Sequence, residues 1–213
     1  MSSVAVIDYG MGNLHSIEKA LQHASPEVDV QIVSDAKKIQ QCDRILFPGV
    51  GAIRDCMKAL DSSGLSPIIK DVAKTKPFLG ICLGMQALLT DSEENNHTSC
   101  LDIFPGHVKH FSTDITDADG SRLKIPHMEW NKVTQKTHPL WEGIPQNSRF
   151  YFVHSYYAKP DNVSDIIATT DYPQAFTSAL AKDNVFAVQF HPEKSQAVGL
   201  QLLKNFLSWD GNC

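Results

Sequence analysis

Apolar residues in the first eighty positions follow two alternating patterns. Short β-branched or alternating runs that stop at glycine, proline or charged residues predict strands at 4–8, 28–33, 44–47 and 78–81. Apolar residues at helical spacing predict helices at 14–24, 55–60 and 65–73, and Asn13 is placed to cap the first of them. Because strands that alternate with helices are typical of βαβ units, we expect a mostly parallel central sheet covered by helices on both faces.

The pattern changes in the second half of the chain. Short strands divided by turn residues are predicted at 149–157, 166–170, 175–180 and 185–190, and they indicate an antiparallel C-terminal portion. The polar segments 90–98 and 113–122 are expected to be irregular, and a final helix directs Val198, Leu202, Leu203, Phe206 and Leu207 toward the core. Because there is no internal repeat, low-complexity tract or linker, we expect residues 1–213 to form a single α/β domain.

The charge and the cysteines limit the class of partner and the compartment. The formal net charge of −5 leaves no footprint for a phosphate backbone, so we expect no nucleic-acid partner. No apolar run approaches the length of a membrane span, and residues 1–9 do not form a signal peptide. The five cysteines are odd in number and form no Cys-x-x-Cys pair, which favours free thiols in a reducing compartment, the cytoplasm.

One segment combines a reactive side chain with two flanking glycines. Gly80, Cys82 and Gly84 follow the predicted strand 78–81 and open a helix, in the pattern of a nucleophile elbow with cysteine in place of serine. The sharp turn leaves no room for side chains two positions before and after the nucleophile. The N-terminus of the following helix favours an anion, and therefore the thiolate of Cys82. The alternative is a buried cysteine with incidental glycines.

A cysteine nucleophile needs a base, and the base needs a group that orients it. His191 stands out among nine histidines because it follows the apolar strand 185–190, where the carboxyl end of a sheet would present it to a crevice. Pro192 is expected to hold the next residues extended, so that His191 and Glu193 point the same way. Glu193 would then fix the imidazole tautomer. Without Cys82, the pair would be interpreted as a solvated surface turn.

Backbone donors for an oxyanion are expected on the same edge of the sheet. The segment Gly49, Val50 and Gly51 follows the strand 44–47, and its glycines let backbone N–H groups approach a substrate. The N–H of Leu83, directly after the nucleophile, is the natural second donor. The segment lacks the spacing and the lysine of a phosphate-binding loop.

Nothing in the sequence indicates a metal or a cofactor. His107 and His110 are spaced like a helical metal pair, but no third ligand with suitable spacing stands near them, so a surface pair is the preferred interpretation. The aromatic run 150–152 is interpreted as core packing. We therefore expect neither a metal nor a cofactor.

Two motifs more than a hundred residues apart occur together in one known family. The resemblance to class I (triad) glutamine amidotransferases is carried by Gly80-Ile81-Cys82-Leu83-Gly84-Met85-Gln86 and Val188-Gln189-Phe190-His191-Pro192-Glu193. It covers almost the whole chain, because the segments 8–14, 47–52, 126–131 and 152–156 are similar to the branch of the family that supplies ammonia in histidine biosynthesis.

The resemblance implies a mechanism and a set of site residues. Cys82 would attack the carboxamide of L-glutamine, His191 would protonate the departing ammonia, and water would release glutamate from the thioester. The oxyanion hole would lie at 49–51. The backbone groups of the glutamine substrate would be held by Gln86, Glu94, Ser155 and Tyr156.

The resemblance also implies a partner, a (β/α)₈-barrel cyclase that receives the ammonia and forms a heterodimer with this chain. The family positions near that interface are matched by Gly10, Met11, Gly12, Asn13, Trp130, Asn131 and Lys194. One departure bears on the partner, since the family pattern has glycine where this chain has Glu129. The alternatives are a relative that feeds another acceptor, such as a sugar-amidating enzyme of surface polysaccharide synthesis, and a non-catalytic binding protein. The intact set of Cys82, His191 and Glu193 argues against the last.

Overall fold

The centre of the molecule is a block of parallel strands, seen in a computed structural model that describes residues 2–112, 116, 120 and 124–212. In spatial order the block contains β2 (Asp29–Val33), β1 (Ser3–Ile7), β3 (Arg44–Phe47), β4 (Phe78–Ile81) and β14 (Val185–Val188). All four pairings in this block are parallel. The carboxyl ends of the strands therefore meet at one edge of the sheet, as the alternation of strands and helices predicted.

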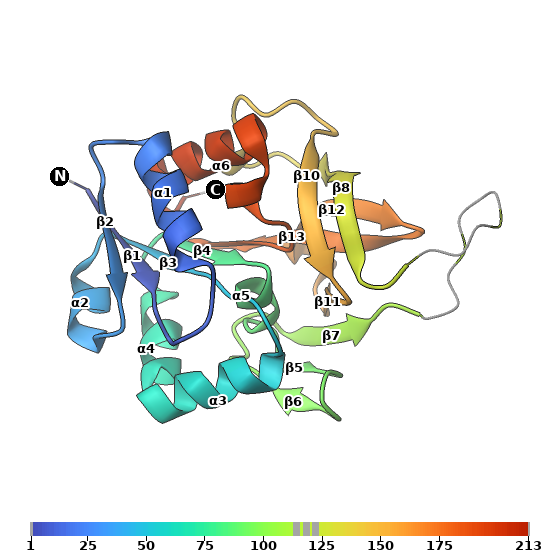
Figure 1. Ribbon diagram of the computed structural model, residues 1–213, viewed down its shortest axis with the longest axis horizontal. Coiled ribbons are helices and arrows are strands. Elements are labelled where there is room, and N and C mark those ends of the chain that lie inside the picture. Colours follow the sequence, from blue (N-terminus) through green and yellow to red (C-terminus); the bar gives the residue numbers. More distant parts are fainter. Residues whose placement is uncertain (1, 113–115, 117–119, 121–123, 213) are drawn as a thin grey trace.

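Helices cover both faces of this block (Figure 1). One face carries α1 (Leu14–Ala24) and α6 (Gln196–Ser208), and the other carries α2 (Ala36–Gln41), α3 (Ile53–Ser63) and α4 (Leu65–Val72). Alternate residues of β1 serve the two faces, because Val6 packs with the first group of helices and Ile7 with the second. The short helix α2 was not anticipated, since Ile39 is its one buried residue. Among the described residues, no helix is long and apolar enough to cross a membrane.

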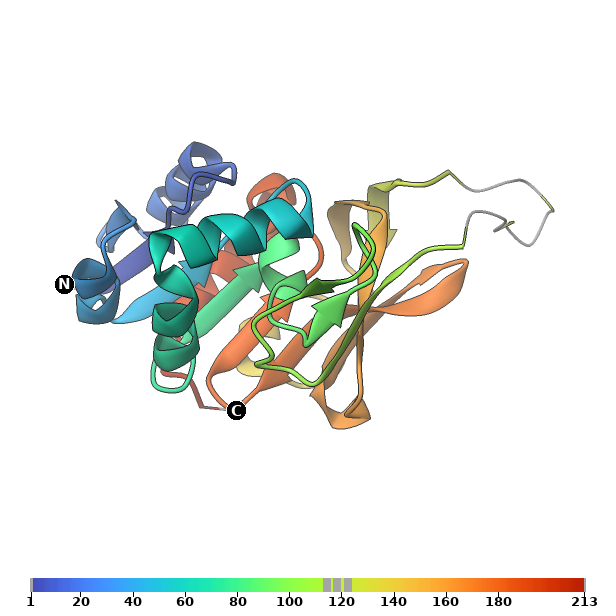
Figure 2. The ribbon, with the colours of Figure 1, turned by 90° about the horizontal axis from the view of Figure 1, so that it is seen from below.

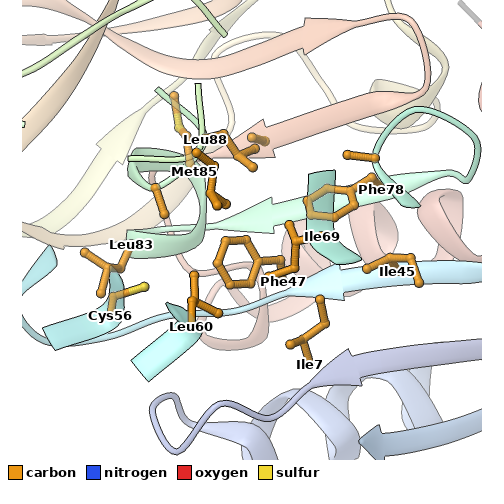
Figure 3. Close-up of a cluster of buried hydrophobic side chains, with 14 of the residues drawn as sticks. Ile7, Ile45, Phe47, Cys56, Leu60, Ile69, Phe78, Leu83, Met85 and Leu88 are labelled. Atoms are coloured by element: carbon orange, nitrogen blue, oxygen red, sulfur yellow. The ribbon is translucent and has the colours of Figure 1, made fainter. Parts of the chain in front are cut away.

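The core beneath α3 and α4 supports the start of the segment that contains Cys82 (Figure 3). Phe47 and Phe78 form an edge-to-face pair with ring centroids 6.2 Å apart, and both side chains are fully buried. Leu83 and Met85, which closely follow Cys82, belong to the same cluster. Each fully buried large apolar side chain contributes about 1.5–3 kcal/mol to stability. The position of Cys82 is therefore fixed by packing on both sides of it in sequence.

The sheet continues beyond β14 with mostly antiparallel strands, which confirms the predicted C-terminal portion (Figures 1 and 2). These strands are β13 (Gln174–Lys182), β12 (Ile166–Tyr172), β11 (Tyr156–Pro160), β9 (Thr134–Gln135), β7 (Gly106–His110), β5 (Asp91–Ser92) and β6 (Thr98–Ser99). A separate antiparallel pair is formed by β10 (Arg149–His154) and β8 (His127–Lys132). Three-residue 3₁₀ helices lie at Pro139–Trp141, Val163–Asp165 and Pro192–Lys194.

One predicted strand was wrong in an informative way. The segment 149–157 is not continuous, because the chain leaves the two-stranded sheet at Ser155 and enters the large sheet as β11. The strands β7 and β8 were not anticipated, and the polar segment 90–98 contains the short strand β5 and the start of β6. Apart from residues 116 and 120, most of the predicted loop 113–122 lies outside the described residues.

Candidate functional site

Cys82 occupies a strained turn between β4 and the single-turn helix α5 (Leu83–Gln86). Its φ is 54° and its ψ is −109°, a conformation that non-glycine residues rarely adopt. The backbone N–H of Cys82 donates to the carbonyl of Val188 at 2.7 Å, which ties the elbow to β14. Because α5 has only four residues, its anion-stabilising effect comes from the N–H groups of one turn rather than from a long helix.

The glycine after the nucleophile is required by the neighbouring strand. A Cβ on Gly84 would lie 2.1 Å from the carbonyl oxygen of Phe47, so no side chain fits there. Gly80 is less restricted, since its Cβ would lie 3.2 Å from the Cβ of Ala187. The sequence pattern therefore identified a real steric requirement, and the collision that matters is with the end of β3.

His191 and Glu193 form a buried pair. Nδ1 of His191 lies 2.8 Å from Oε1 of Glu193, and the two side chains are 2% and 1% exposed. The segment is not extended as expected, because Pro192 begins the 3₁₀ helix Pro192–Lys194. Proline is well suited to the first position of such a turn, and the turn still brings the carboxylate back to the imidazole.

The charge on His191 is set by two opposing effects. Burial disfavours the imidazolium, but the Cys82 thiolate and the Glu193 carboxylate outweigh burial and raise the pKa of His191 to about 10. Within the described part of the chain, Nε2 of His191 and Oε2 of Glu193 are buried without a hydrogen-bond partner. The free Nε2 leaves one side of the ring available for proton transfer.

A pocket of about 260 Å³ opens beside Cys82 and His191. Its other lining residues are Val50, Gly51, Leu83, Gln86, Glu94, Val153, His154, Ser155, Tyr156 and Lys194. The structure thus brings most of the sequence-predicted residues around one cavity. Gly49 and Glu193 do not line it: Gly49 packs beneath the pocket against Tyr9 and Leu83, and Glu193 lies behind His191.

Two of the predicted substrate-binding side chains are partly occupied by protein contacts. Nε2 of Gln86 donates to the carbonyl of Tyr156 at 3.0 Å and to Oε1 of Gln189 at 2.9 Å, so both of its N–H groups are used. Oε2 of Glu94 accepts from the N–H of Ile53 at 3.0 Å. The amide oxygen of Gln86 and the second carboxylate oxygen of Glu94 remain as acceptors, which suits an ammonium group.

The residues expected at a partner interface fall in two places. The loop with Met11 and Gly12 lies against the segment 48–51, because Met11 Cε is 2.9 Å from where a Cβ on Gly51 would be. Asn13 begins α1, but its side chain makes no capping hydrogen bond.

The second place is the face of β8 and β10 near the pocket. The ring of Trp130 lies 6.1 Å from that of Tyr151, and Lys194 Nζ lies 5.8 Å from the centre of the Tyr151 ring. Asn131 Nδ2 donates to the carbonyl of Asp171 at 2.9 Å. Glu129, on the same strand as Trp130, is half-exposed.

Sequence reasoning missed four residues at the site. Val153 and His154 line the pocket, Gln189 contacts Cys82, and Tyr9 donates to the carbonyl of Pro48 at 2.9 Å. Gln189 stands two residues before His191, and this spacing was the available signal. Nothing local pointed to Tyr9, which lies thirty-nine residues from its acceptor.

The two histidines that were weighed as a metal pair lie on a strand, so their helical spacing has no structural meaning. His107 Nδ1 contacts Oδ1 of Asp91 at 2.8 Å, and the ring of His110 packs edge-on against Tyr156. Among the described residues, no group of three histidine, cysteine, aspartate or glutamate side chains is arranged to hold a metal ion.

Comparisons with solved structures agree on the fold. The chain superposes on a putative GMP synthase component from Thermoplasma acidophilum with a TM-score of 0.70 and 22% identity, over 98% of this chain and 93% of that one. PurLQS from Thermotoga maritima gives a TM-score of 0.71 and 15% identity, over 97% and 98% of the two chains.

Sequence comparisons extend over nearly the full length. The chain is 59% identical to subunit HisH of imidazole glycerol phosphate synthase from Methylococcus capsulatus, over 99% of this chain and 98% of the relative. It is 57% identical to the subunit of the same name from Nitrosococcus oceani, over 99% of both chains. The family model for glutamine amidotransferase class-I matches residues 5–209. The chain therefore belongs to the class-I glutamine amidotransferases.

Proposed function

We propose that this chain is the glutaminase subunit of imidazole glycerol phosphate synthase, which hydrolyses L-glutamine to glutamate and ammonia. Near-full-length identity of 57–59% to relatives that bear this name supports the assignment. The observation that carries it is the buried pair of His191 and Glu193, which shares a pocket edge with the strained Cys82. Such a pair supplies the proton transfers that thiol-based amide hydrolysis requires.

The proposed reaction follows from this geometry. The Cys82 thiolate attacks the carboxamide carbon and forms a tetrahedral oxyanion, which the N–H groups of Leu83 and of the segment 49–51 stabilise. The His191 imidazolium gives its proton to the departing nitrogen, so that ammonia leaves and a thioester remains. Neutral His191 then takes a proton from water, whose oxygen attacks the thioester and releases glutamate. Glu193 keeps the ring in one tautomer throughout.

The pocket offers complementary groups for the α-substituents of glutamine. The free oxygens of Gln86 and Glu94 are acceptors for its ammonium group. Ser155 and Tyr156, which line the same cavity, are proposed to hold the remaining backbone groups of the substrate. The pocket volume of about 260 Å³ is sufficient for one amino acid, though it falls just below the usual range for drug-sized ligands.

The proposed acceptor of the ammonia is a (β/α)₈-barrel cyclase, bound through the loop 10–13 and through Trp130, Asn131 and Lys194. Lys194 supports this placement because it lines the glutamine pocket and also lies over the ring of Tyr151 on β10. Glu129 is half-exposed on β8, so its carboxylate is accommodated without burial, and the departure from the family pattern does not disturb the fold. The product of the assembled enzyme would be imidazole glycerol phosphate, with AICAR as the second product.

The test is glutamate release by the purified chain, alone and with a candidate cyclase and its ligand. We expect low turnover alone and a rise when the cyclase binds. Cys82→Ser should abolish turnover with the fold intact, because serine provides no anionic nucleophile at neutral pH. A Cys82→Ser variant with most of its activity would exclude the nucleophile assignment, and full turnover by the isolated chain would exclude the dependence on a partner.

A further inference from the structure

A buried amide lies against the proposed nucleophile and has no part in the reaction described above. Nε2 of Gln189 is 3.7 Å from the sulfur of Cys82, within the range of an N–H···S hydrogen bond, and the Gln189 side chain is fully buried. The backbone of Gln189 is fixed as well, since its N–H donates to the carbonyl of Ser178 at 2.9 Å.

The orientation of this amide is determined by its neighbour. Gln86 uses one N–H to bond the Tyr156 carbonyl, an acceptor only, so its Nε2 must face that way. Its second N–H then points to Gln189, which must present its oxygen to Gln86 and its NH₂ group to Cys82. The reverse orientation would place two donors against each other on one side and an oxygen against the sulfur on the other.

The Tyr156 carbonyl is itself held from a second side. Nδ1 of His154 donates to it at 2.7 Å, and Nε2 of His154 accepts from Nδ1 of His127 at 2.9 Å. Burial lowers the pKa of His154 to about 3 and that of His127 to about 4, so both rings are neutral at physiological pH and each keeps one tautomer. The chain of bonds therefore runs from β8, through β10 and α5, to the elbow.

We infer that Gln189 is a further functional residue of the glutaminase site: oriented by Gln86, it donates to the Cys82 sulfur, stabilises its thiolate and directs it toward the pocket. This inference rests on the proposed role of Cys82. A hydrogen bond from a buried neutral donor to an ionised acceptor is roughly twice as strong as one between neutral groups. Because Gln189 is uncharged, it favours the thiolate without competing with His191 for a proton.

The experiment is alkylation of Cys82 by iodoacetamide, followed by mass spectrometry of the peptide that contains it, in the wild type, Gln189→Leu and Gln189→Glu. Alkylation requires neither glutamine nor a partner, so a failure here is distinct from a failure of the proposed function. The titratable or charged groups that face Cys82 or line its pocket are unchanged in these variants: Tyr9, Glu94, His154, Tyr156, His191 and Lys194.

We expect Gln189→Leu to lower the alkylation rate at pH 7 by about tenfold, because a hydrogen bond to a charged group is lost. At pH 10 the two rates should converge, since the thiolate then forms without help. Gln189→Glu keeps the acceptor for Gln86 but turns an oxygen toward the sulfur, so its rate should fall further. A change in packing alone would lower the rate equally at both pH values.

Matched controls separate this effect from a general loss of structure. Thr170→Val removes a buried hydroxyl that has no hydrogen-bond partner among the described residues, on β12, and should leave Cys82 alkylation unchanged. Burial raises the pKa of Cys56 to about 11 and that of Cys100 to about 12, so these thiols provide internal references that react slowly. Folded Gln189→Leu and Gln189→Glu variants whose Cys82 reacts like that of the wild type at pH 7 would overturn the inference.

Discussion

Replacing Glu193 by glutamine tests how the protein sets the charge of His191. The substitution keeps the shape of the side chain and an oxygen that can accept from Nδ1, so the tautomer of His191 is retained. It removes the negative charge that lies 2.8 Å from the ring in a site where both side chains are almost completely buried. The change therefore isolates electrostatics from geometry.

The magnitude follows from the contact. Two unit charges about 4 Å apart attract by about 4 kcal/mol at an effective dielectric constant of about 20. The neutral hydrogen bond that remains in the variant is worth about 1 kcal/mol, so about 3 kcal/mol is lost. That loss lowers the pKa of His191 from about 10 to roughly 8, because one pKa unit corresponds to about 1.4 kcal/mol.

The sign of the stability effect can be stated in the same terms. The folded-state pKa of His191 lies above the ordinary value of 6.5. The stability gained from protonating His191 is therefore complete below about pH 6.5 and is lost as the pH rises through the folded-state pKa. In the wild type the loss extends to about pH 10, and in Glu193→Gln it should be finished near pH 8.

Two measurements check the prediction. The ¹H–¹³C NMR titration of the His191 ring should move to lower pH in Glu193→Gln, and the alkaline limb of kcat/KM for glutamine should move with it. Glu18→Gln is the matched control, because Glu18 is the partner of His15, 3.6 Å away on the exposed side of α1. If the His191 titration of Glu193→Gln coincides with that of the wild type, the carboxylate does not stabilise the imidazolium and the reasoning fails.

Two further predictions concern the backbone around the pocket. Tyr9→Phe removes the hydroxyl that donates to the Pro48 carbonyl, so we expect a loss of about 1–3 kcal/mol in the free energy of unfolding and a lower kcat for glutamine with little change in KM; an unchanged kcat in urea-stable protein would show that the hydroxyl does not position the segment 49–51. Gly84→Ala places a Cβ 2.1 Å from the Phe47 carbonyl oxygen, and we expect it to lower Tm by several degrees and to abolish turnover, whereas a variant with the wild-type Tm would mean that the elbow can shift away from β3.

The parallel half of the fold was predictable because its signals are local. Each strand of the central block is a short apolar run, and the helices between strands repeat their apolar residues at helical spacing. The antiparallel half was harder, because a strand such as β10 has the same alternating pattern whichever sheet it joins. The break at Ser155, which separates β10 from β11, depends on contacts with β8 and β7 that no local pattern reports.

The sequence by itself determined the chemical identities at the site: a cysteine between two glycines, a histidine with a carboxylate two residues later, and a glycine-rich segment after the third strand. The tertiary structure alone decided how those groups are used. The 3₁₀ turn at Pro192 replaced the expected extended segment and still brought Glu193 to His191. The bonds of Gln86 to Tyr156 and Gln189 join residues 70 and 103 positions apart. Buried polar groups must find partners wherever the fold brings them, so these bonds are settled by packing rather than by local sequence.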